Sequence, residues 1–247
     1  MLFDTGKLRY LIGIETKDTH TTSKCRTRIL KYHGYIDKID AILAFNTIAV
    51  SDMNQGKKQR GKKAAIGSIR IIAGKHRGRK LPVLMAEGLR PTTDRVKETV
   101  FNWLMPYIHN ANCLDCFAGA GSLGFEASSR GAAYVTLIEL NKTATKQLQA
   151  NIKLLNADNV IVTNTNSLDF LKSSTKQHYD LVFIDPPFRE DLVTKTAELL
   201  NNGWLADQAL IYVEMEINSN QPLPNNWQLL KEKVAGQVAY RLYQYTV

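Results

Sequence analysis

Short apolar runs and helical periodicities divide the second half of the chain into alternating strands and helices. From residue 113 onward, runs with strand character alternate with segments whose apolar residues recur every three or four positions. Strands are expected at residues 113–116, 134–139, 160–163, 180–184 and 209–214, and helices near 122–130, 143–155 and 190–201. This spacing is typical of stacked βαβ units and predicts a mainly parallel sheet covered by helices.

Hairpin patterns flank this region on both sides. Near the C-terminus, two alternating segments on either side of Ala235–Gly236 predict a closing antiparallel hairpin. Upstream, residues 68–74 and 79–83 are strand candidates joined by the basic turn Lys75–His76–Arg77–Gly78. The predicted fold class is α/β, a Rossmann-like sheet of seven mainly parallel strands with a C-terminal antiparallel hairpin and a small N-terminal β-hairpin.

One further helix is expected between the first hairpin and the parallel strands. Pro91 would stop a helix before it, and Thr93 or Asp94 can cap the helix that follows. The apolar stripe of this helix would consist of Val96, Val100, Phe101 and Leu104.

Residues 1–52 differ from the rest of the chain, because they have weak periodicity and no motif. A polar, basic stretch follows from Met53 and predicts a flexible arm. Either residues 1–52 form an appendage unrelated to the remainder, or translation starts at Met53, and we favour the second explanation. The expected organisation is an extension of unknown role at 1–52, a basic arm and hairpin at 53–89, and the main domain at 90–247.

Composition indicates an acidic partner. The chain has 247 residues, of which 44% are hydrophobic, and a net charge of +9, so nucleic acid is favoured over a membrane surface. Ten Lys or Arg residues and no Asp or Glu lie between Lys57 and Lys80. Such a run can be a solvated face. The alternative is an arm that lies along phosphates, in which case Lys75, Arg77 and Arg79 are the candidate contacts.

The compartment is expected to be the cytoplasm. The most apolar early stretch, residues 39–50, contains Asp40 and is shorter than the roughly 20 residues needed to span a bilayer. Three cysteines give no even disulfide framework, and nothing resembles a secretory signal.

A glycine-rich turn is the first candidate for chemistry. Gly119, Gly121 and Gly124 have GxGxxG spacing directly after a predicted strand and at the start of a helix. Glycines there let the backbone approach a ligand and leave helix N–H groups free to bind it. The ligand could be a dinucleotide or the methionine end of S-adenosylmethionine.

Two acidic residues bear on that choice. Asp115, on the strand before the turn, could meet the ammonium of S-adenosylmethionine directly or through water, whereas it would repel a pyrophosphate. Glu139 ends the next strand and can accept both ribose hydroxyls, although NAD enzymes use the same device. Phe117, inside the turn, is a further candidate cofactor contact.

The C-x-x-C pair Cys113 and Cys116 invites a metal or redox interpretation, which we reject. No second ligand set accompanies it, and in an extended strand the two side chains point to opposite faces. The five histidines show no metal-ligand spacing, so no metal is expected.

The candidate catalytic segment is Asp185–Pro186–Pro187–Phe188, directly after a buried strand. Taken alone it could be an ordinary turn. At the carboxyl end of a strand in a sheet with this glycine turn, it predicts methylation of an exocyclic amine. Asp185 and the Pro186 carbonyl can accept the two N–H bonds of the amine, both prolines fix the loop, and Phe188 can stack on the base.

Several longer segments resemble the bacterial 16S rRNA guanine-N2 methyltransferases that modify guanine 966. The resemblance extends from about residue 66 to the C-terminus and includes IRIIAGKHRGRKLPV, LRPTTDRVKETVFNWL, CLDCFAGAGSLGFEA, FIDPPF, NGWLADQALIYVE and KVAGQVAYRLYQ. It implies a class I methyltransferase fold for residues 90–247, S-adenosylmethionine as methyl donor, and 16S rRNA within a 30S subunit or assembly particle as substrate. It also implies that Arg90, Pro91 and Thr92 lie near the cofactor and that Asn166 and Ser167 flank its adenine ring.

Other functions share some of these features. Asp-Pro-Pro-Phe also suits adenine-N6 or cytosine-N4 methylation of DNA, but no separate target-recognition domain is evident. Methylation of protein glutamine fits the positive charge poorly, and a dehydrogenase has no use for Asp-Pro-Pro-Phe. A non-catalytic RNA-binding assembly factor would not be expected to keep Asp185 and Glu139 together with the glycine turn.

Overall fold

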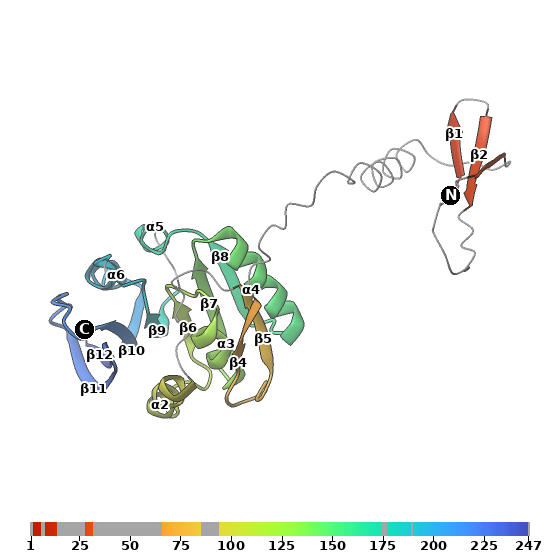
Figure 1. Ribbon diagram of the computed structural model, residues 1–247. Helices are drawn as coiled ribbons and strands as arrows, with labels where there is room; N and C mark the ends of the chain where they lie inside the picture. Colours follow the sequence, from red (N-terminus) through yellow and green to blue (C-terminus); the bar gives the residue numbers. More distant parts are fainter. Residues whose placement is uncertain are drawn as a thin grey trace. The chain divides into compact units, whose positions relative to one another are not determined.

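The computed structural model describes residues 2–5, 8–13, 28–31, 66–84, 94–173, 177–188 and 190–246, and the chain divides into two compact units, Met1–Lys63 and Ala64–Val247. In the first unit, β1 (Leu2–Thr5), β2 (Leu8–Gly13) and β3 (Arg28–Lys31) form an antiparallel sheet in the order β1-β2-β3 (Figure 1). The sequence pattern predicted no strands here.

The second unit is built on a seven-stranded sheet of order β11-β12-β10-β9-β6-β7-β8. Its parallel strands are β6 (Asn112–Asp115), β7 (Tyr134–Glu139), β8 (Val160–Asn164), β9 (Tyr179–Ile184) and β10 (Leu205–Glu216). The antiparallel strands β11 (Trp227–Ala235) and β12 (Val238–Tyr245) close the sheet. The predicted fold class is confirmed.

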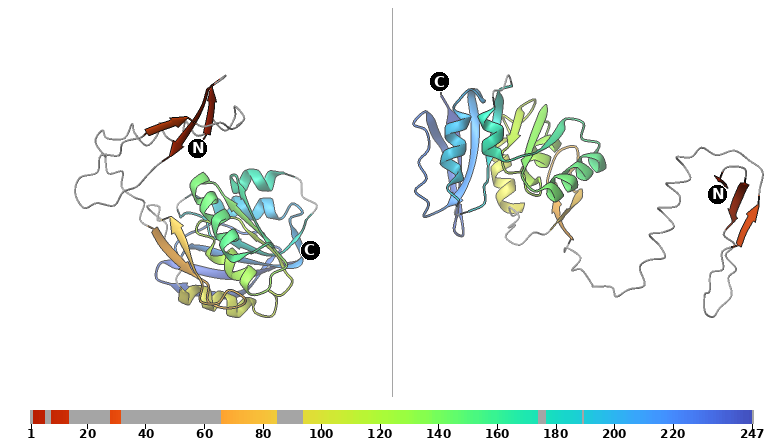
Figure 2. Two further views of the ribbon diagram at one scale, coloured as in Figure 1. Left: turned by 90° about the vertical axis from the view of Figure 1, so that its right-hand side faces the viewer. Right: turned by 90° about the horizontal axis from the view of Figure 1, so that it is seen from above.

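Helices cover the two faces of this sheet, and the two layers can be followed in Figure 2. On one face, α2 (Asp94–Leu104), α3 (Ser122–Ser129) and α4 (Lys142–Leu155) share a core with the hairpin β4 (Ile66–Arg70) and β5 (Lys80–Leu84). On the other, α5 (Ser167–Lys172) and α6 (Leu192–Leu200) pack in a second core. The six-residue helix α5 was not predicted.

Buried polar side chains of α2 and α3 hold the β4–β5 hairpin against the rest of the second unit. Glu126 of α3 is fully buried, and its carboxylate accepts the N–H groups of Ile72 at 2.7 Å and Ala73 at 3.0 Å. From α2, the buried Lys97 ammonium donates to the Arg70 carbonyl at 2.5 Å, and burial lowers the pKa of this lysine. The hairpin therefore belongs to the same compact unit as the sheet, whereas the basic arm expected at residues 53–65 lies outside the described residues.

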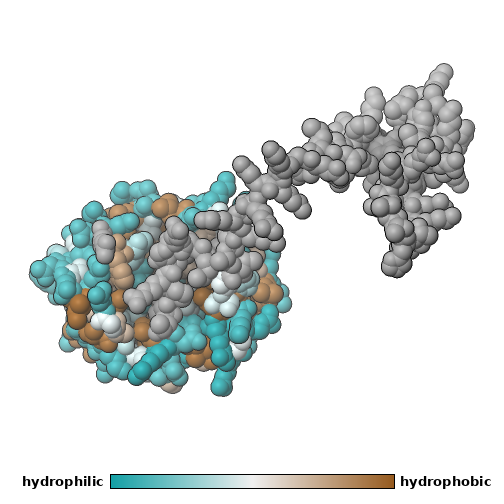
Figure 3. Space-filling view, in the orientation of Figure 1, coloured by the Kyte–Doolittle hydropathy of each residue, from teal (hydrophilic) through white to brown (hydrophobic). Residues whose placement is uncertain are grey.

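The described surface is mixed in character. On the face shown in Figure 3, hydrophobic residues are interspersed among hydrophilic ones. Within the described ranges, no helix is long and apolar enough to cross a membrane.

Candidate active site

The glycine turn joins β6 to α3 at the carboxyl edge of the sheet. Gly119 has φ 51° and Gly121 φ 77°, in the left-handed region that favours glycine. A Cβ on Gly121 would also lie 2.5 Å from the Phe125 ring. Gly121 is the N-cap of α3 and supplies no side-chain cap, so the N–H groups of Ser122 and Leu123 at the start of this helix remain available to an incoming ligand.

Glu139, at the end of β7, is bonded to this turn. Its half-buried carboxylate accepts the Gly119 N–H at 2.9 Å through Oε2 and the Asn141 N–H at 2.6 Å through Oε1. Burial raises the pKa of Glu139, and both N–H groups act in the opposite direction. Each carboxylate oxygen has a second lone pair, so both can still accept a ribose hydroxyl.

Asp115 lies beneath the turn and is only 2% exposed. Its carboxylate accepts the backbone N–H groups of Phe117 and Gly124, which hold the two ends of the turn. Burial, with a smaller contribution from the charge of Glu139, raises the pKa of Asp115 to about 7, although the two N–H groups act in the opposite direction. Asp115 thus fixes the shape of the turn. Its contact with the ammonium group of the cofactor stays a prediction, and so does a contact between the cofactor and the half-buried Phe117.

Asn166 and Ser167 connect the end of β8 to the same turn. The Asn166 side chain caps α5 by accepting the Leu168 N–H at 2.8 Å. The buried Ser167 hydroxyl donates to the Cys116 carbonyl, directly before the glycine turn. These two residues therefore lie at the same edge as Glu139, although their contact with an adenine ring is not tested by these bonds.

Sequence reasoning missed Leu140 at this edge. It follows Glu139 directly and is 67% exposed, and the Asn164 amide holds its carbonyl at 2.9 Å. An exposed apolar side chain beside the candidate ribose acceptor offers a surface for the cofactor's ring. Nothing in the sequence marked this residue, because single apolar side chains are common on protein surfaces.

The segment Asp185–Pro186–Pro187–Phe188 follows β9, which pairs with β6 in the centre of the sheet. The Cys116 N–H donates to the Phe183 carbonyl at 3.0 Å, so this segment and the glycine turn leave the sheet side by side. Pro186 is buried, Asp185 is half-buried, and Phe188 is 38% exposed. The structure brings these residues to the same edge as Asp115, Gly119, Gly121 and Glu139.

The basic residues of the first hairpin lie elsewhere. The Lys75 N–H donates to the Ser129 carbonyl at 2.7 Å, and the Arg79 guanidinium donates through Nη2 to the Leu154 carbonyl at 3.1 Å. Ser129 and Leu154 end α3 and α4, so the exposed side chains of Lys75, Arg77 and Arg79 lie at the edge where the parallel strands begin. In Figure 1 this turn is at the bottom, while α5, which follows β8, is at the top.

The other predicted residues have simpler outcomes. Arg90, Pro91 and Thr92 lie outside the described residues. Cys113 and Cys116 are buried in the two separate cores, as expected for opposite faces of a strand, and burial raises the pKa of both thiols. Across the described part of the chain, no group of three or more His, Cys, Asp or Glu is arranged to hold a metal ion.

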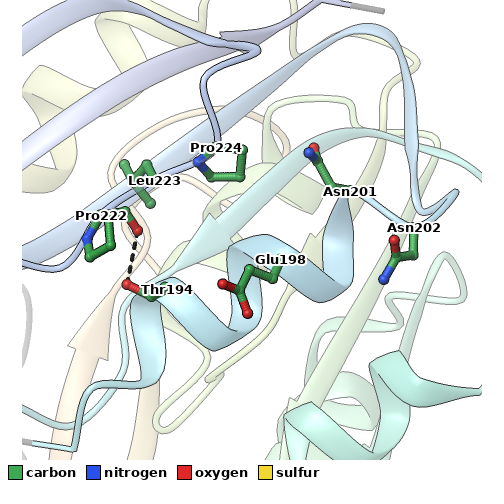
Figure 4. A pocket seen from close by; sticks show the side chains of 7 residues that line it. All are labelled: Thr194, Glu198, Asn201, Asn202, Pro222, Leu223 and Pro224. Atoms are coloured by element: carbon green, nitrogen blue, oxygen red, sulfur yellow. Dashed lines mark hydrogen bonds between the residues drawn. The ribbon is translucent and has the colours of Figure 1, made fainter.

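One hollow lies between α6 and the connection from β10 to β11 (Figure 4). The Thr194 hydroxyl donates to the Pro222 carbonyl at 2.8 Å across it. None of the predicted site residues is among those that line it, which are Thr194, Glu198, Asn201, Asn202, Pro222, Leu223 and Pro224.

Similarity to known proteins identifies the family. The model of the family described as Conserved hypothetical protein 95 matches residues 69–244. Ribosomal RNA small subunit methyltransferase D of Escherichia coli K12 is 58% identical over 180 residues, which cover 72% of this chain and 90% of the relative. The chain belongs to this methyltransferase family. The Haemophilus influenzae protein of the same name is 58% identical over 184 residues, covering 73% of this chain and 95% of the relative.

A solved structure of this family agrees with the fold. The yhhF protein of Escherichia coli has 56% sequence identity and a TM-score of 0.68, covering 73% of this chain and 99% of its own. Membership of the methyltransferase D family confirms the predicted fold class and S-adenosylmethionine as the cofactor. It does not favour the DNA methyltransferase or the non-catalytic assembly factor.

Proposed function

We propose that this protein transfers a methyl group from S-adenosylmethionine to the exocyclic N2 amine of a guanine in 16S rRNA, by resemblance guanine 966. The observation that carries the proposal is the position of Asp185–Pro186–Pro187–Phe188, which follows β9 directly beside the glycine turn. The names of the relatives, which specify ribosomal RNA of the small subunit, and the net charge of +9 support an RNA substrate.

The residues around the turn fit S-adenosylmethionine, which supplies an electrophilic methyl group when bound. The uncapped start of α3 and the Ser122 hydroxyl, which is buried and has no hydrogen-bond partner, suit a carboxylate. Glu139 suits the two ribose hydroxyls, and the exposed Leu140 side chain suits the adenine ring. Asn166, Ser167, Arg90 and Thr92 are proposed to complete this site.

Asp185 orients the amine. The lone pair of an exocyclic amine is delocalised into the base, so the nitrogen is a weak nucleophile. When the Asp185 carboxylate and the Pro186 carbonyl accept its two N–H bonds, a pyramidal nitrogen with a directed lone pair is favoured. Pro186 and Pro187 restrict the backbone, so these acceptors are in place before the substrate arrives. The remaining contribution is alignment of the reacting atoms.

Phe188 provides a stacking surface for the target base. Phe188 is 38% exposed and follows Asp185 by three residues, although large apolar side chains are usually buried. A base that is paired or stacked in RNA must be extruded to reach a carboxylate at the sheet edge, and aromatic stacking offsets part of that cost.

The substrate is proposed to be a 30S subunit or assembly particle in the cytoplasm. The exposed Lys75 and Arg77 side chains lie at the opposite edge of the sheet from Asp185. The intervening helix α3 has eight residues, which is roughly 12 Å of helix. A folded RNA is large enough to reach both edges at once, whereas a single extruded nucleotide is not.

Substitution of Asp185 tests this proposal. Asp185→Ala should keep donor binding and lose turnover by about 100- to 1,000-fold, as on removal of one preorganised transition-state partner. Asp185→Asn should retain more activity than Asp185→Ala, because an amide oxygen still accepts an N–H bond. Glu190→Ala, which removes a carboxylate shortly after the segment, is the matched control.

Three results would count against the orientation role. If Asp185→Asn is as inactive as Asp185→Ala and the wild-type rate follows one carboxylate pKa, Asp185 acts as a general base. If neither substitution slows methyl transfer, the segment is only a turn. Loss of donor binding in Asp185→Ala would place this carboxylate in the cofactor site instead.

A further inference from the structure

We propose that Glu214 selects guanine by accepting its N1–H beside Asp185, an inference that rests on the function proposed above. Asp-Pro-Pro-Phe suits amino groups on adenine, cytosine and guanine, so this tetrapeptide alone does not distinguish the bases. A second group within reach of the same base edge must do so.

The strand register brings Glu214 next to Asp185. Strands β9 and β10 are parallel neighbours, with Tyr212 opposite Phe183 and Val213 opposite Ile184. If this register continues for one more residue, Glu214 lies opposite Asp185. Neighbouring strands of a sheet are about 4.8 Å apart. Because side chains alternate along a strand, Asp185 lies on the face of Phe183, and Glu214 lies on the face of Tyr212.

Ring contacts show that these two faces are the same. The Phe183 ring centroid lies 6.2 Å from that of Tyr212 and 6.0 Å from that of Phe101 in α2. Burial raises the pKa of the Tyr212 hydroxyl, and the charges of Glu214 and Asp185 add to this effect. The strand register and the ring contacts thus put Asp185 on the same face as Tyr212 and Glu214.

The Glu214 carboxylate is held in position. It is 7% exposed, and its Oε1 accepts the hydroxyl of the fully buried Tyr212 at 2.6 Å. Tyr240 of β12 lies opposite it in the sheet and stacks on Trp103 at 5.6 Å between ring centroids. One hydroxyl uses one of about four lone-pair positions of a carboxylate, so Glu214 has capacity for a further donor.

The donor pattern of guanine matches two adjacent carboxylates. Guanine presents N1–H and the N2 amine next to each other on its Watson–Crick edge. Adenine and cytosine present a bare ring nitrogen beside their amine, and a carboxylate would repel that lone pair. With the N2 amine at Asp185, the neighbouring N1–H would point towards the next strand, where Glu214 lies. When adenine or cytosine occupies the site, the buried Glu214 carboxylate has no N–H group to accept, and this unpaired charge makes binding less favourable. Sites built in this way reject the wrong substrate.

The alternative is a structural role, in which Glu214 only satisfies the buried Tyr212 hydroxyl. The two roles differ in what they predict for a base that keeps its 2-amino group but lacks N1–H. 2-Aminopurine is such a base. The experiment measures methyl transfer from labelled S-adenosylmethionine to small-subunit particles that carry guanine or 2-aminopurine at the modified position.

Wild-type protein should prefer guanine by more than about 10-fold, the loss expected for one charge-assisted hydrogen bond. Glu214→Gln should narrow this preference by raising the rate on 2-aminopurine, because a side-chain amide can donate to the bare N1. Tyr212→Phe keeps the charge of Glu214 and should keep the preference. Glu232→Gln, at an exposed carboxylate on β11, is the matched control.

Two outcomes would overturn the inference. If the wild-type protein methylates guanine and 2-aminopurine at equal rates, the inference is wrong, and no variant is needed to show this. An equal loss on both bases in Glu214→Gln would assign Glu214 the structural role. If the wild-type protein fails to methylate guanine at all, the function proposed above fails, and this result is distinct from both.

Discussion

At the scale of single residues, Asp115 is a buried carboxylate whose pKa lies near neutral pH. Burial raises its pKa from 3.8 to about 7, and only the N–H groups of Phe117 and Gly124 act against this. A carboxyl whose pKa is raised by folding stabilises the folded state fully below the unfolded pKa. That contribution is lost as the pH rises through the folded pKa. The free energy of unfolding should therefore fall between about pH 4 and pH 7 through this residue.

We predict that donor binding has the opposite pH dependence. If Asp115 pairs with the cofactor ammonium, it must be ionised to do so, and binding releases its proton. Affinity for S-adenosylhomocysteine should then rise up to about tenfold per pH unit below pH 7 and level off above it. Titration calorimetry between about pH 5.5 and 8 measures this. The Asp115→Asn variant should bind S-adenosylhomocysteine weakly, and its affinity should not depend on pH in this range. If the affinity of the wild-type protein does not change with pH, Asp115 has only the structural role of holding the turn.

Glu139 should contribute to donor binding rather than to the chemical step. Glu139→Gln keeps one acceptor oxygen but sets an amide group against a backbone N–H of Gly119 or Asn141. Loss of one or two charge-assisted bonds, each worth roughly 1.5–3 kcal/mol, should raise the KM for S-adenosylmethionine by about 10-fold or more. Turnover at saturation should be largely retained, as steady-state kinetics would show. An unchanged KM would put the ribose elsewhere.

At the scale of elements, the first hairpin presents its charges on a fixed support. Lys75 and Arg79 are anchored at the ends of α3 and α4 through Ser129 and Leu154. Lys75 makes its bond through its backbone N–H, whereas Arg79 makes its bond through its side chain. Part of the role of the Arg79 guanidinium is therefore structural. Lys75 and Arg77 remain exposed side chains that can meet phosphates.

Neutralising this turn should weaken RNA binding in a salt-dependent way. In the variant Lys75→Gln, Arg77→Gln, Arg79→Gln, the slope of log affinity against log salt should shrink by about 0.7–0.9 for each phosphate that the turn no longer neutralises. Donor affinity should not change. Lys195→Gln, an exposed charge on α6, is the control. An unchanged salt slope in filter-binding assays with 30S particles would mean that the turn faces solvent.

The elements also show what the sequence could and could not predict. Strands such as Tyr134–Glu139 were located from their apolar runs, and the glycine turn and Asp185 from local motifs. The six-residue helix α5 has too few apolar positions to show a period, and its start depends on the Asn166 cap. The position of the basic turn depends on Glu126, which is more than 50 residues away in the sequence. Such long-range contacts have no local pattern.

At the scale of the whole molecule, the chain consists of two units, and the family match begins at residue 69, within the second. The strands β1, β2 and β3 pair only with one another among the described strands. Every described residue of the candidate active site lies in the second unit.

A chain that starts at Met53 should therefore fold and remain active. We expect the unfolding of its methyltransferase unit to have the same melting temperature as in the full chain. Its rate of methyl transfer should also match that of the full chain. Circular dichroism melts and labelled-donor assays compare the two. Insoluble protein, or a rate well below that of the full chain, would show that residues 1–52 contribute to folding or substrate binding.

The central claim is that the edge formed by the glycine turn, Glu139 and Asp185 methylates guanine N2 in 16S rRNA. The most direct test is mass spectrometry of nucleosides from unmodified 30S particles incubated with the protein and isotope-labelled S-adenosylmethionine. The account predicts label in N2-methylguanosine, at one site in 16S rRNA, and labelling that is about 100- to 1,000-fold slower with Asp185→Ala. Label in N6-methyladenosine or N4-methylcytidine, or no label in RNA, would contradict it.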